Sequence, residues 1–303
     1  MEFALKVAFL GIGLMGQPMC KRLINAGFEL TLWNRTTGKT DQFRQQVKIA
    51  KDAAEAIKNA DIIVTMLENG DVVEQVLYSD DTYKISNKNS LFIDMSSIPP
   101  ETARRHGRLI HDHGCSYIDA PVSGGTKGAE TGTLSIMVGG SETQFQRADK
   151  LFLSLGDATH IGDIGSGQLC KLANQAIVGI TIGAVSEALL LAAKGGANPE
   201  AVYKALGGGF AASRVLELHG RRMLDRDFKP GATARVQLKD LKTILNEAKS
   251  EGLSLPLSQQ SHDNYQSLID NGHENIDHSG LLLELERLNR TRLSTASVQN
   301  TDA

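Results

Sequence analysis

The stretch VAFLGIGLMGQPM, residues 7–19, decides how the chain begins to fold. Its four residues Val7–Leu10 are apolar and predict a buried β-strand, and the residues after the glycines have a helical pattern. Gly11, Gly13 and Gly16 form G-x-G-x-x-G between them. Here the first glycine allows a tight turn, the second lets the backbone approach a pyrophosphate, and the third lets the helix pack closely on the strand. The stretch therefore predicts a strand, a dinucleotide-binding turn and a helix whose N-terminus faces phosphates.

Short apolar runs alternate with helical patterns through the first half of the chain. We predict strands over Val7–Leu10, Glu29–Leu32, Ile62–Met66, Leu91–Asp94, Tyr117–Asp119 and Ser135–Val138. Helical patterns such as Pro18–Ala26 and Ala53–Lys58 lie between the earlier strands. Strands that are almost continuously apolar are typical of a parallel sheet covered on both faces. Residues 1–163 are therefore predicted to form an α/β domain of the Rossmann type, which binds NAD(P).

The alternation of strand and helix patterns ends after residue 163. Residues 167–195 form one apolar helical pattern, which is long for a globular protein and predicts a helix between two domains. Further helical patterns follow, with no strong strand signal, at 199–207, 211–224, 236–251, 256–271 and 278–290. We therefore expect an all-α domain for substrate binding and oligomerisation over 164–291, and a polar, frayed tail over 292–303.

The composition restricts the classes of partner. The 303 residues are 41% hydrophobic and 22% charged, with a net charge of −3 and both signs interspersed. These values are typical of a globular protein and predict neither nucleic-acid nor membrane binding. Three widely spaced cysteines predict free buried thiols in a reducing compartment. Because no targeting signal and no apolar run of membrane-spanning length is evident, we expect a cytoplasmic protein.

The end of the second predicted strand indicates the cofactor. NAD-binding domains usually carry Asp or Glu there, which holds the ribose 2′-hydroxyl. This chain reads LTLWNRTTGK over 30–39, with Asn34, Arg35 and Thr36 in that place. Arg35 can pair with a 2′-phosphate while its two neighbours donate hydrogen bonds, so NADP(H) is preferred and NAD remains possible. Leu14, Met15 and Leu67 are also predicted to contact the cofactor.

Two further features suggest a substrate site. Ser123, Gly124 and Gly125 follow a predicted strand and could hold a carboxylate, although a simple turn would have the same composition. Lys171 lies within the apolar helical pattern, where a lysine that reaches out to solvent is the alternative to a functional one. Asn174 shares its helix face at i+3, which favours the functional interpretation.

Three histidines in RRHGRLIHDHG raise the question of a metal site. His106, His111 and His113 lie on a predicted amphipathic helix rich in arginine, which favours a solvated face over a metal site. We therefore interpret this helix face as solvated and expect no metal.

Four motifs together resemble the β-hydroxyacid dehydrogenase family, in the family's order and over nearly the whole chain. They are GIGLMG, DAPVSGG, GSGQLCKLANQ and LKDL. The resemblance implies a Rossmann domain, a long interdomain helix and a helical domain that supports homodimers or homotetramers. It also implies roles for single residues. Lys171 would be the catalytic acid/base, with Asn174 positioning the substrate. Ser123, Gly124 and Gly125 would hold the substrate carboxylate, and Ser97 and Lys239 would contact the cofactor.

Within the family, the segments KLANQAIVG, SEALLLAAKGGANPE, MLDRDFKPG and DHSGL are most similar to tartronate semialdehyde (2-hydroxy-3-oxopropionate) reductases. The expected reaction is reduction of a short, carboxylate-bearing aldehyde, tartronate semialdehyde, to glycerate, with Lys171 as proton donor. The alternatives are 3-hydroxyisobutyrate dehydrogenase, succinic semialdehyde reductase and glyoxylate reductase. A non-catalytic NADPH-binding module is the alternative from another class, and the lysine at 171 argues against it. Asp277 and Ser279 resemble a family feature without an assigned role.

Overall fold

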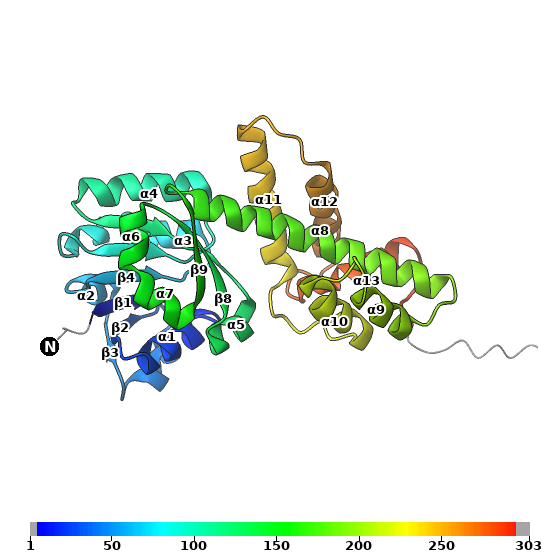
Figure 1. Ribbon diagram of the computed structural model, residues 1–303, viewed down its shortest axis with the longest axis horizontal. Coiled ribbons are helices and arrows are strands. Elements are labelled where there is room, and N and C mark those ends of the chain that lie inside the picture. Colours follow the sequence, from blue (N-terminus) through cyan, green and yellow to red (C-terminus); the bar gives the residue numbers. More distant parts are fainter. Residues whose placement is uncertain (1–4, 295–303) are drawn as a thin grey trace, which may run out of the picture. The chain divides into compact units, whose positions relative to one another are not determined.

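The computed structural model describes residues 5–294 and divides into two compact units, Met1–Lys171 and Leu172–Ala303. Figure 1 shows both units, joined by the helix α8 (Ser166–Lys194), which begins in the first and continues in the second. The predicted domain bounds, which place the change at residue 163, stay a prediction. Of the predicted tail over 292–303, residues 295–303 lie outside the described part of the chain.

The first unit alternates strands and helices. Its strands are β1 (Lys6–Leu10), β2 (Glu29–Trp33), β3 (Lys48–Ile49), β4 (Ile62–Thr65), β5 (Leu91–Asp94), β6 (Ser116–Asp119), β7 (Val122–Ser123), β8 (Leu134–Gly139) and β9 (Gly156–Gly162). Its helices are α1 (Gly16–Asn25), η1 (Thr37–Phe43), α2 (Ala53–Ile57), α3 (Gly70–Val73), η2 (Glu74–Tyr78), η3 (Thr82–Ile85), α4 (Pro100–Asp112), α5 (Gly125–Thr131), α6 (Glu142–Arg147) and α7 (Asp149–Leu155).

The described strands form one sheet in the order β3-β2-β1-β4-β5-β6-β8-β7, with β9 beside β8. The first six are parallel, whereas β8 is antiparallel to β6 and β7. The order 3-2-1-4-5-6 is that of the doubly wound dinucleotide-binding fold, whose ligand crevice lies where the strand order reverses. The predicted Rossmann-type domain is therefore confirmed, and β1 and β4 flank that crevice.

Successive side chains of a strand point to opposite faces of the sheet, and here each face is covered by its own buried core. In β1, Val7 and Phe9 join one core with α1 and α7, whereas Ala8 and Leu10 join the other with α2 and α4. This two-sided burial explains why the parallel strands read as continuous apolar runs.

The second unit consists of helices around one core, as predicted. After α8 come α9 (Pro199–Gly207), η4 (Leu216–Gly220), α10 (Arg221–Asp225), α11 (Ala234–Ser250), α12 (Pro256–Asp270), η5 (His278–Gly280) and α13 (Leu281–Leu288). Tyr265 and Leu268 of α12 are fully buried there with Ile182 and Leu189 of α8.

Among the strands of residues 5–294, three were not predicted: β3, β7 and β9. Two of them are only two residues long. The third, β9, pairs in parallel with β8, but its residues alternate between exposed and half-buried, so no apolar pattern marks it. Its first residue needs to be glycine, since a Cβ on Gly156 would lie 1.9 Å from the carbonyl oxygen of Leu134.

The interpretation of the histidine-bearing helix face as solvated is wrong for His106. His111 is exposed and His113 half-buried, but the His106 side chain is 0% exposed. Its ring stacks on Tyr78 at 3.9 Å between centroids, and its Nε2 lies 2.8 Å from a carboxylate oxygen of Glu74. Burial lowers the pKa of His106 and thus favours the neutral ring.

The expectation that no apolar run reaches membrane-spanning length is also wrong. The helix α8 has 29 residues and is long and apolar enough to cross a membrane. Core helices of soluble proteins share these properties, and α8 supplies Leu172, Ile182 and Leu189 to the core of the second unit. Length and composition alone therefore do not make α8 a membrane span.

Candidate active site

The glycine turn lies between β1 and α1, at the carboxyl end of the sheet. Gly11 has a φ of +110°, and a Cβ there would lie 2.3 Å from the carbonyl oxygen of Met66. A Cβ on Gly16 would lie 1.9 Å from the carbonyl oxygen of Gly11. Gly13, in contrast, has nothing within 4 Å of a Cβ position. Two glycines are therefore required by packing inside the protein, whereas Gly13 leaves open space beside the turn.

These residues fit a bound dinucleotide. The open space at Gly13 leaves the backbone accessible to a phosphate, and the first turn of α1 carries no acidic side chain that would repel one. Leu14 is exposed and Met15 half-buried in the same turn.

Asn34 ties the glycine turn to the segment after β2. Its side-chain oxygen accepts a hydrogen bond of 2.8 Å from the backbone N–H of Ile12, and its NH₂ group donates one of 2.9 Å to the Thr36 carbonyl. Asn34 thus holds two segments of the predicted cofactor site together, a contact that sequence reasoning missed. Arg35 and Thr36 are exposed beside it.

The loops after β4 and β5 are joined through buried hydrogen bonds. Asp94 accepts bonds of 2.8 Å from the Thr65 hydroxyl and 3.0 Å from the Ser96 backbone N–H. The Ser96 hydroxyl in turn accepts a bond of 3.0 Å from the backbone N–H of Leu67. This network fixes the backbone of the loops after β4 and β5 relative to each other, and it places the half-buried Ser97 next to Ser96.

The loop Ser123–Gly125 follows β6 and runs into α5. Ser123 is half-buried at the end of β7, opposite Ser135 of β8. Gly124 and Gly125 are exposed and have φ values of +132° and +62°, a region that side chains disfavour. The glycines are thus required by the backbone path, which leaves their N–H groups near the surface.

Lys171 lies on the second turn of α8 and belongs to the same unit as the glycine turn and the three strand-end loops. Its side chain is half-buried. Cys170 beside it is a half-buried free thiol, and Cys20 and Cys115 are free and buried.

In the second unit, hydrogen bonds connect two other predicted site residues. Asn174 donates a bond of 2.9 Å to the side-chain oxygen of Gln175, whose NH₂ group donates one of 2.6 Å to Asp240. The Asp240 carboxylate also pairs with the ammonium of Lys239 at 3.0 Å. Gln175 and the buried Asp240 therefore position Asn174 and Lys239, although no sequence pattern singled out Asp240.

Comparisons with known proteins agree with this fold and show the family. Residues 6–165 match the NAD binding domain of 6-phosphogluconate dehydrogenase, and residues 165–285 match the NAD-binding domain of NADP-dependent 3-hydroxyisobutyrate dehydrogenase. The 2-hydroxy-3-oxopropionate reductase of Escherichia coli is 42% identical over 96% of this chain and 100% of its own length. The chain belongs to the β-hydroxyacid dehydrogenase family.

Other members of this family are similar over most of their length. A probable 3-hydroxyisobutyrate dehydrogenase-like protein of Arabidopsis thaliana is 35% identical over 98% of this chain and 89% of its own. The structure of 3-hydroxyisobutyrate dehydrogenase from Mycobacterium tuberculosis with L-serine has a TM-score of 0.85 and 30% identity, covering 93% of this chain and 99% of that one. As a β-hydroxyacid dehydrogenase, the protein is an NAD(P)-dependent oxidoreductase acting on a CH–OH group or the corresponding carbonyl.

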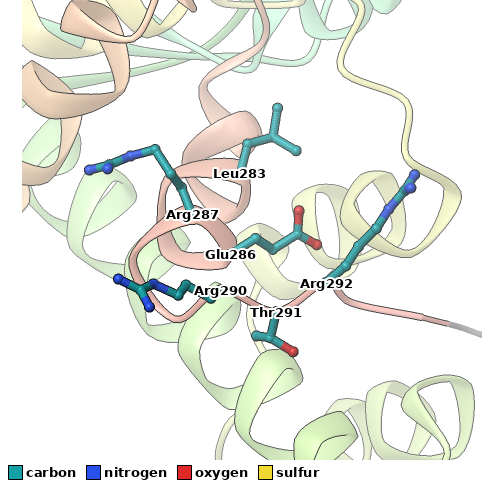
Figure 2. Close-up of a pocket in the computed structure, with 6 residues that line it drawn as sticks. All are labelled: Leu283, Glu286, Arg287, Arg290, Thr291 and Arg292. Atoms are coloured by element: carbon teal, nitrogen blue, oxygen red, sulfur yellow. The ribbon is translucent and has the colours of Figure 1, made fainter.

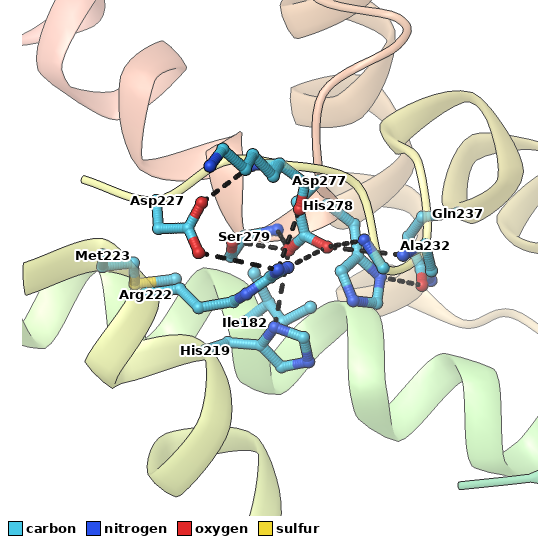
Figure 3. Close-up of polar contacts among 12 residues, drawn as sticks. Ile182, His219, Arg222, Met223, Asp227, Ala232, Gln237, Asp277, His278 and Ser279 are labelled. Atoms are coloured by element: carbon cyan, nitrogen blue, oxygen red, sulfur yellow. Dashed lines mark hydrogen bonds and ion pairs between the residues drawn. The ribbon is translucent and has the colours of Figure 1, made fainter. Parts of the chain in front are cut away.

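Asp277 and Ser279 of the dehydrogenase lie in a buried polar cluster of the second unit (Figure 3). Asp277 accepts hydrogen bonds from the Ser279 hydroxyl at 2.6 Å and from the backbone N–H of Gly231 at 2.9 Å. The Arg222 guanidinium forms an ion pair with the same carboxylate. Asp277 thus connects its own segment to the loop before α11, which gives it a structural role.

The same cluster contains a possible ligand set, because His219, Asp277 and His278 bring donor atoms within 4.8 Å of one another. However, Arg222 already pairs with the Asp277 carboxylate. A bound cation would have to lie beside this guanidinium, so the arrangement disfavours a metal.

His278 should make the stability of the dehydrogenase depend on pH. Burial, followed by the neighbouring His219, lowers its pKa to about 4, whereas an unfolded histidine has a pKa of about 6.5. The unfolded chain therefore takes up this proton first as the pH falls. The free energy of unfolding is therefore highest above about pH 6.5, and it falls by on the order of 3 kcal/mol as the pH drops to about 4.

Urea unfolding at several pH values measures this loss. The His278→Asn variant should lose the His278 part of the dependence, whereas His111→Asn, which replaces an exposed histidine, should keep it. Equal pH dependence in the wild type and His278→Asn would contradict the assignment.

A pocket of about 490 Å³ on the second unit contains none of the predicted site residues (Figure 2). It is lined by Leu283, Glu286, Arg287, Arg290, Thr291 and Arg292. Two of its charges are neutralised locally, since Glu286 pairs with Arg226 and Arg287 pairs with Glu284. We therefore assign it no part in the reaction.

Proposed function

We propose that this enzyme is an NADPH-dependent reductase of short aldehydes that carry a carboxylate, with tartronate semialdehyde as substrate and glycerate as product. The observation that carries the proposal is the placement of Lys171, half-buried on the second turn of α8, in the same unit as the glycine turn and the strand-end loops. The 42% identity to a 2-hydroxy-3-oxopropionate reductase, over 96% of this chain and 100% of that protein, supports the choice of substrate.

The residues act by binding, orienting and proton transfer. When bound, NADPH supplies the hydride that the aldehyde carbon accepts. The turn Gly11–Gly16 would hold the pyrophosphate, while Leu67 and Ser97 would contact the cofactor near its nicotinamide. The backbone N–H groups of Ser123–Gly125 bind the substrate carboxylate. Lys171 donates a proton to the oxygen of the former carbonyl group, and Asn174 orients the substrate hydroxyl; Lys239 contributes to cofactor binding.

Lysine suits this task if its pKa lies near the working pH, because a general acid is most efficient there. General acid catalysis of this kind contributes a factor of about 10²–10⁴ to the rate.

The preference for NADPH over NADH rests on Arg35, which is exposed beside Asn34 and has no carboxylate next to it in the chain. We expect Arg35→Ala to raise KM for NADPH by at least about tenfold, because one charge-assisted contact to phosphate contributes roughly 1.5–3 kcal/mol and about 1.4 kcal/mol corresponds to tenfold. KM for NADH should change little. Initial rates with both cofactors measure this; Arg44→Ala, on an exposed arginine that pairs with Asp41, is the control. An equal rise in KM for both cofactors would contradict the role.

The substrate is tested by initial rates with four aldehydes, namely tartronate, methylmalonate and succinic semialdehydes and glyoxylate, each with NADPH and with NADH. We expect the highest kcat/KM with tartronate semialdehyde and NADPH. A higher kcat/KM for methylmalonate semialdehyde would instead favour a 3-hydroxyisobutyrate dehydrogenase. If NADH is the better cofactor by about tenfold, ~1.4 kcal/mol, the cofactor proposal is wrong.

The same proposal includes a cytoplasmic location and a homodimer or homotetramer. Light scattering of the purified protein, together with fractionation of the cells that produce it, tests both.

A further inference from the structure

Gln168 joins the start of α8 to the loop after β5. Its side-chain oxygen accepts a hydrogen bond of 3.1 Å from the backbone N–H of Ile98, and its NH₂ group donates one of 2.8 Å to the carbonyl of Ser96. These two partners are the residues on either side of Ser97. The Gln168 side chain is only 1% exposed, so both bonds are protected from water.

Asp119, at the end of β6, holds the same helix start. Its two carboxylate oxygens accept hydrogen bonds of 2.7 Å from the backbone N–H of Gly165 and 2.8 Å from that of Gln168. They thus satisfy two of the N–H groups that a helix N-terminus leaves without partners. Gly165 and Gln168 belong to the turn that begins α8, so the β6 strand end fixes this turn directly.

Close packing makes the attachment rigid. A Cβ on Gly167 would lie 2.4 Å from the Met137 carbonyl oxygen and 2.8 Å from the Asp119 carboxylate. A Cβ on Gly139 would lie 2.5 Å from the same carboxylate. The first turn of α8 therefore has no room to shift toward β8 or β6.

We propose that Gln168 is a positioning residue for the reduction, which sets the distance between the Ser97 loop and Lys171. Lys171 follows Gln168 by three residues on the same helix face. The inference rests on the proposed function, because it gives Ser97 and Lys171 the roles assigned there. Gln168 itself contacts backbone groups of the loop and acts through the residues that it holds.

The amide is well suited to this task because it offers one donor and one acceptor side by side. An ionised carboxylate at this position would still accept from Ile98 but would face the Ser96 carbonyl without a proton to donate. A protonated carboxyl group has the same donor and acceptor pattern as the amide. In the variant Gln168→Glu, the contact to the Ser96 carbonyl should therefore be broken while the new carboxyl group is ionised and intact when it is protonated.

The charges around position 168 determine the pH at which the new carboxyl group of Gln168→Glu takes up its proton. They include Asp119 on β6, Asp94 on β5, Arg104 on α4 next to Gly165, and Lys171 on the helix itself. Burial and the two aspartates favour the protonated form of a new carboxyl group, whereas the two cations oppose it. Buried glutamates with pKa values as high as about 8–9 are known, so the transition can fall within an assayable range.

The experiment compares wild type, Gln168→Glu and Gln168→Met over a range from about pH 6 to about pH 8.5. At the upper end we expect kcat of Gln168→Glu to be about tenfold below wild type, within the ~10²-fold that a 1 Å misplacement can cost, while KM for NADPH changes less than about twofold. As the pH falls toward about 6, kcat of Gln168→Glu should return toward the wild-type value. Gln168→Met has no donor or acceptor at its end and should stay low at every pH.

Gln260→Glu, which adds the same charge at an exposed glutamine of α12, should follow wild type throughout. Equal pH profiles for the wild type and Gln168→Glu would overturn the proposal, as would wild-type activity in Gln168→Met.

A second readout needs no substrate or cofactor. Amide hydrogen exchange at Ile98 should be faster in Gln168→Met than in wild type, after correction for intrinsic exchange rates, because methionine has no acceptor at its end for the Ile98 N–H. In Gln168→Glu the carboxyl group can accept from Ile98 in both protonation states, so protection there should stay close to wild type. Unchanged protection of Ile98 in Gln168→Met would also overturn the proposal. If the wild type reduces none of the four aldehydes, the proposed function fails, and this exchange measurement still decides whether Gln168 holds the loop.

Discussion

Replacement of Lys171 by alanine is expected to lower kcat by a factor of about 10²–10⁴, the contribution of a positioned general acid. The aldehyde oxygen would then have to take its proton from water. NADPH binding should persist, because the glycine turn and the Asn34 contacts that hold it are separate from position 171. Fluorescence titration with NADPH and steady-state rates with tartronate semialdehyde measure the two effects separately.

The same helix provides a matched control for this variant. Lys194 is an exposed lysine in the last turn of α8, and Lys194→Ala should keep wild-type kcat and NADPH affinity. A Lys171→Ala variant with kcat within about twofold of wild type would remove Lys171 from the mechanism, since even a modest general acid contributes about 10²-fold.

Alanine at Gly13 and at Gly16 should have different effects, although both belong to one turn. A Cβ on Gly16 would lie 1.9 Å from the carbonyl oxygen of Gly11, so the turn must move and the free energy of unfolding should fall by about 1–3 kcal/mol. A Cβ on Gly13 meets nothing within 4 Å, so Gly13→Ala should unfold like wild type. It would instead occupy the space needed by the pyrophosphate and raise Kd for NADPH by about tenfold or more, ~1.4 kcal/mol.

Urea unfolding and NADPH titration of both variants test this contrast. An exposed glycine with free space at its Cβ, such as Gly207 in α9, serves as the control, and Gly207→Ala should change neither quantity for the worse. If Gly13→Ala binds NADPH like wild type, the pyrophosphate does not approach the turn at Gly13.

The parallel strands could be predicted from the sequence because both of their faces are buried. Leu91–Asp94 was predicted with the bounds that the structure has, and β1 differs by one residue. The exposed edge strand β9 could not be predicted, because its alternation of half-buried and exposed residues lacks an apolar signal. The helical second unit followed from the long period-3.6 patterns and the absence of strand signals.

The sequence singles out candidate site residues only where they stand close together in a motif, and their roles stay predictions. The glycine turn and Lys171 fall within short local patterns. Contacts between distant segments have no such signal: Asn34 binds Ile12 across 22 residues, and Gln168 binds Ser96 across 72. His106 was misjudged for the same reason, since its partner Glu74 is 32 residues away.

The central claim is that the enzyme reduces the aldehyde carbon of tartronate semialdehyde by hydride transfer from NADPH. The most direct test is to incubate the wild-type enzyme with tartronate semialdehyde and NADPH that carries deuterium at the transferred position of C4, and to analyse the product by mass spectrometry and NMR. We predict glycerate with one deuterium on the carbon that bears the new hydroxyl group. Consumption of NADPH without deuterated glycerate, or no consumption at all, would contradict the account.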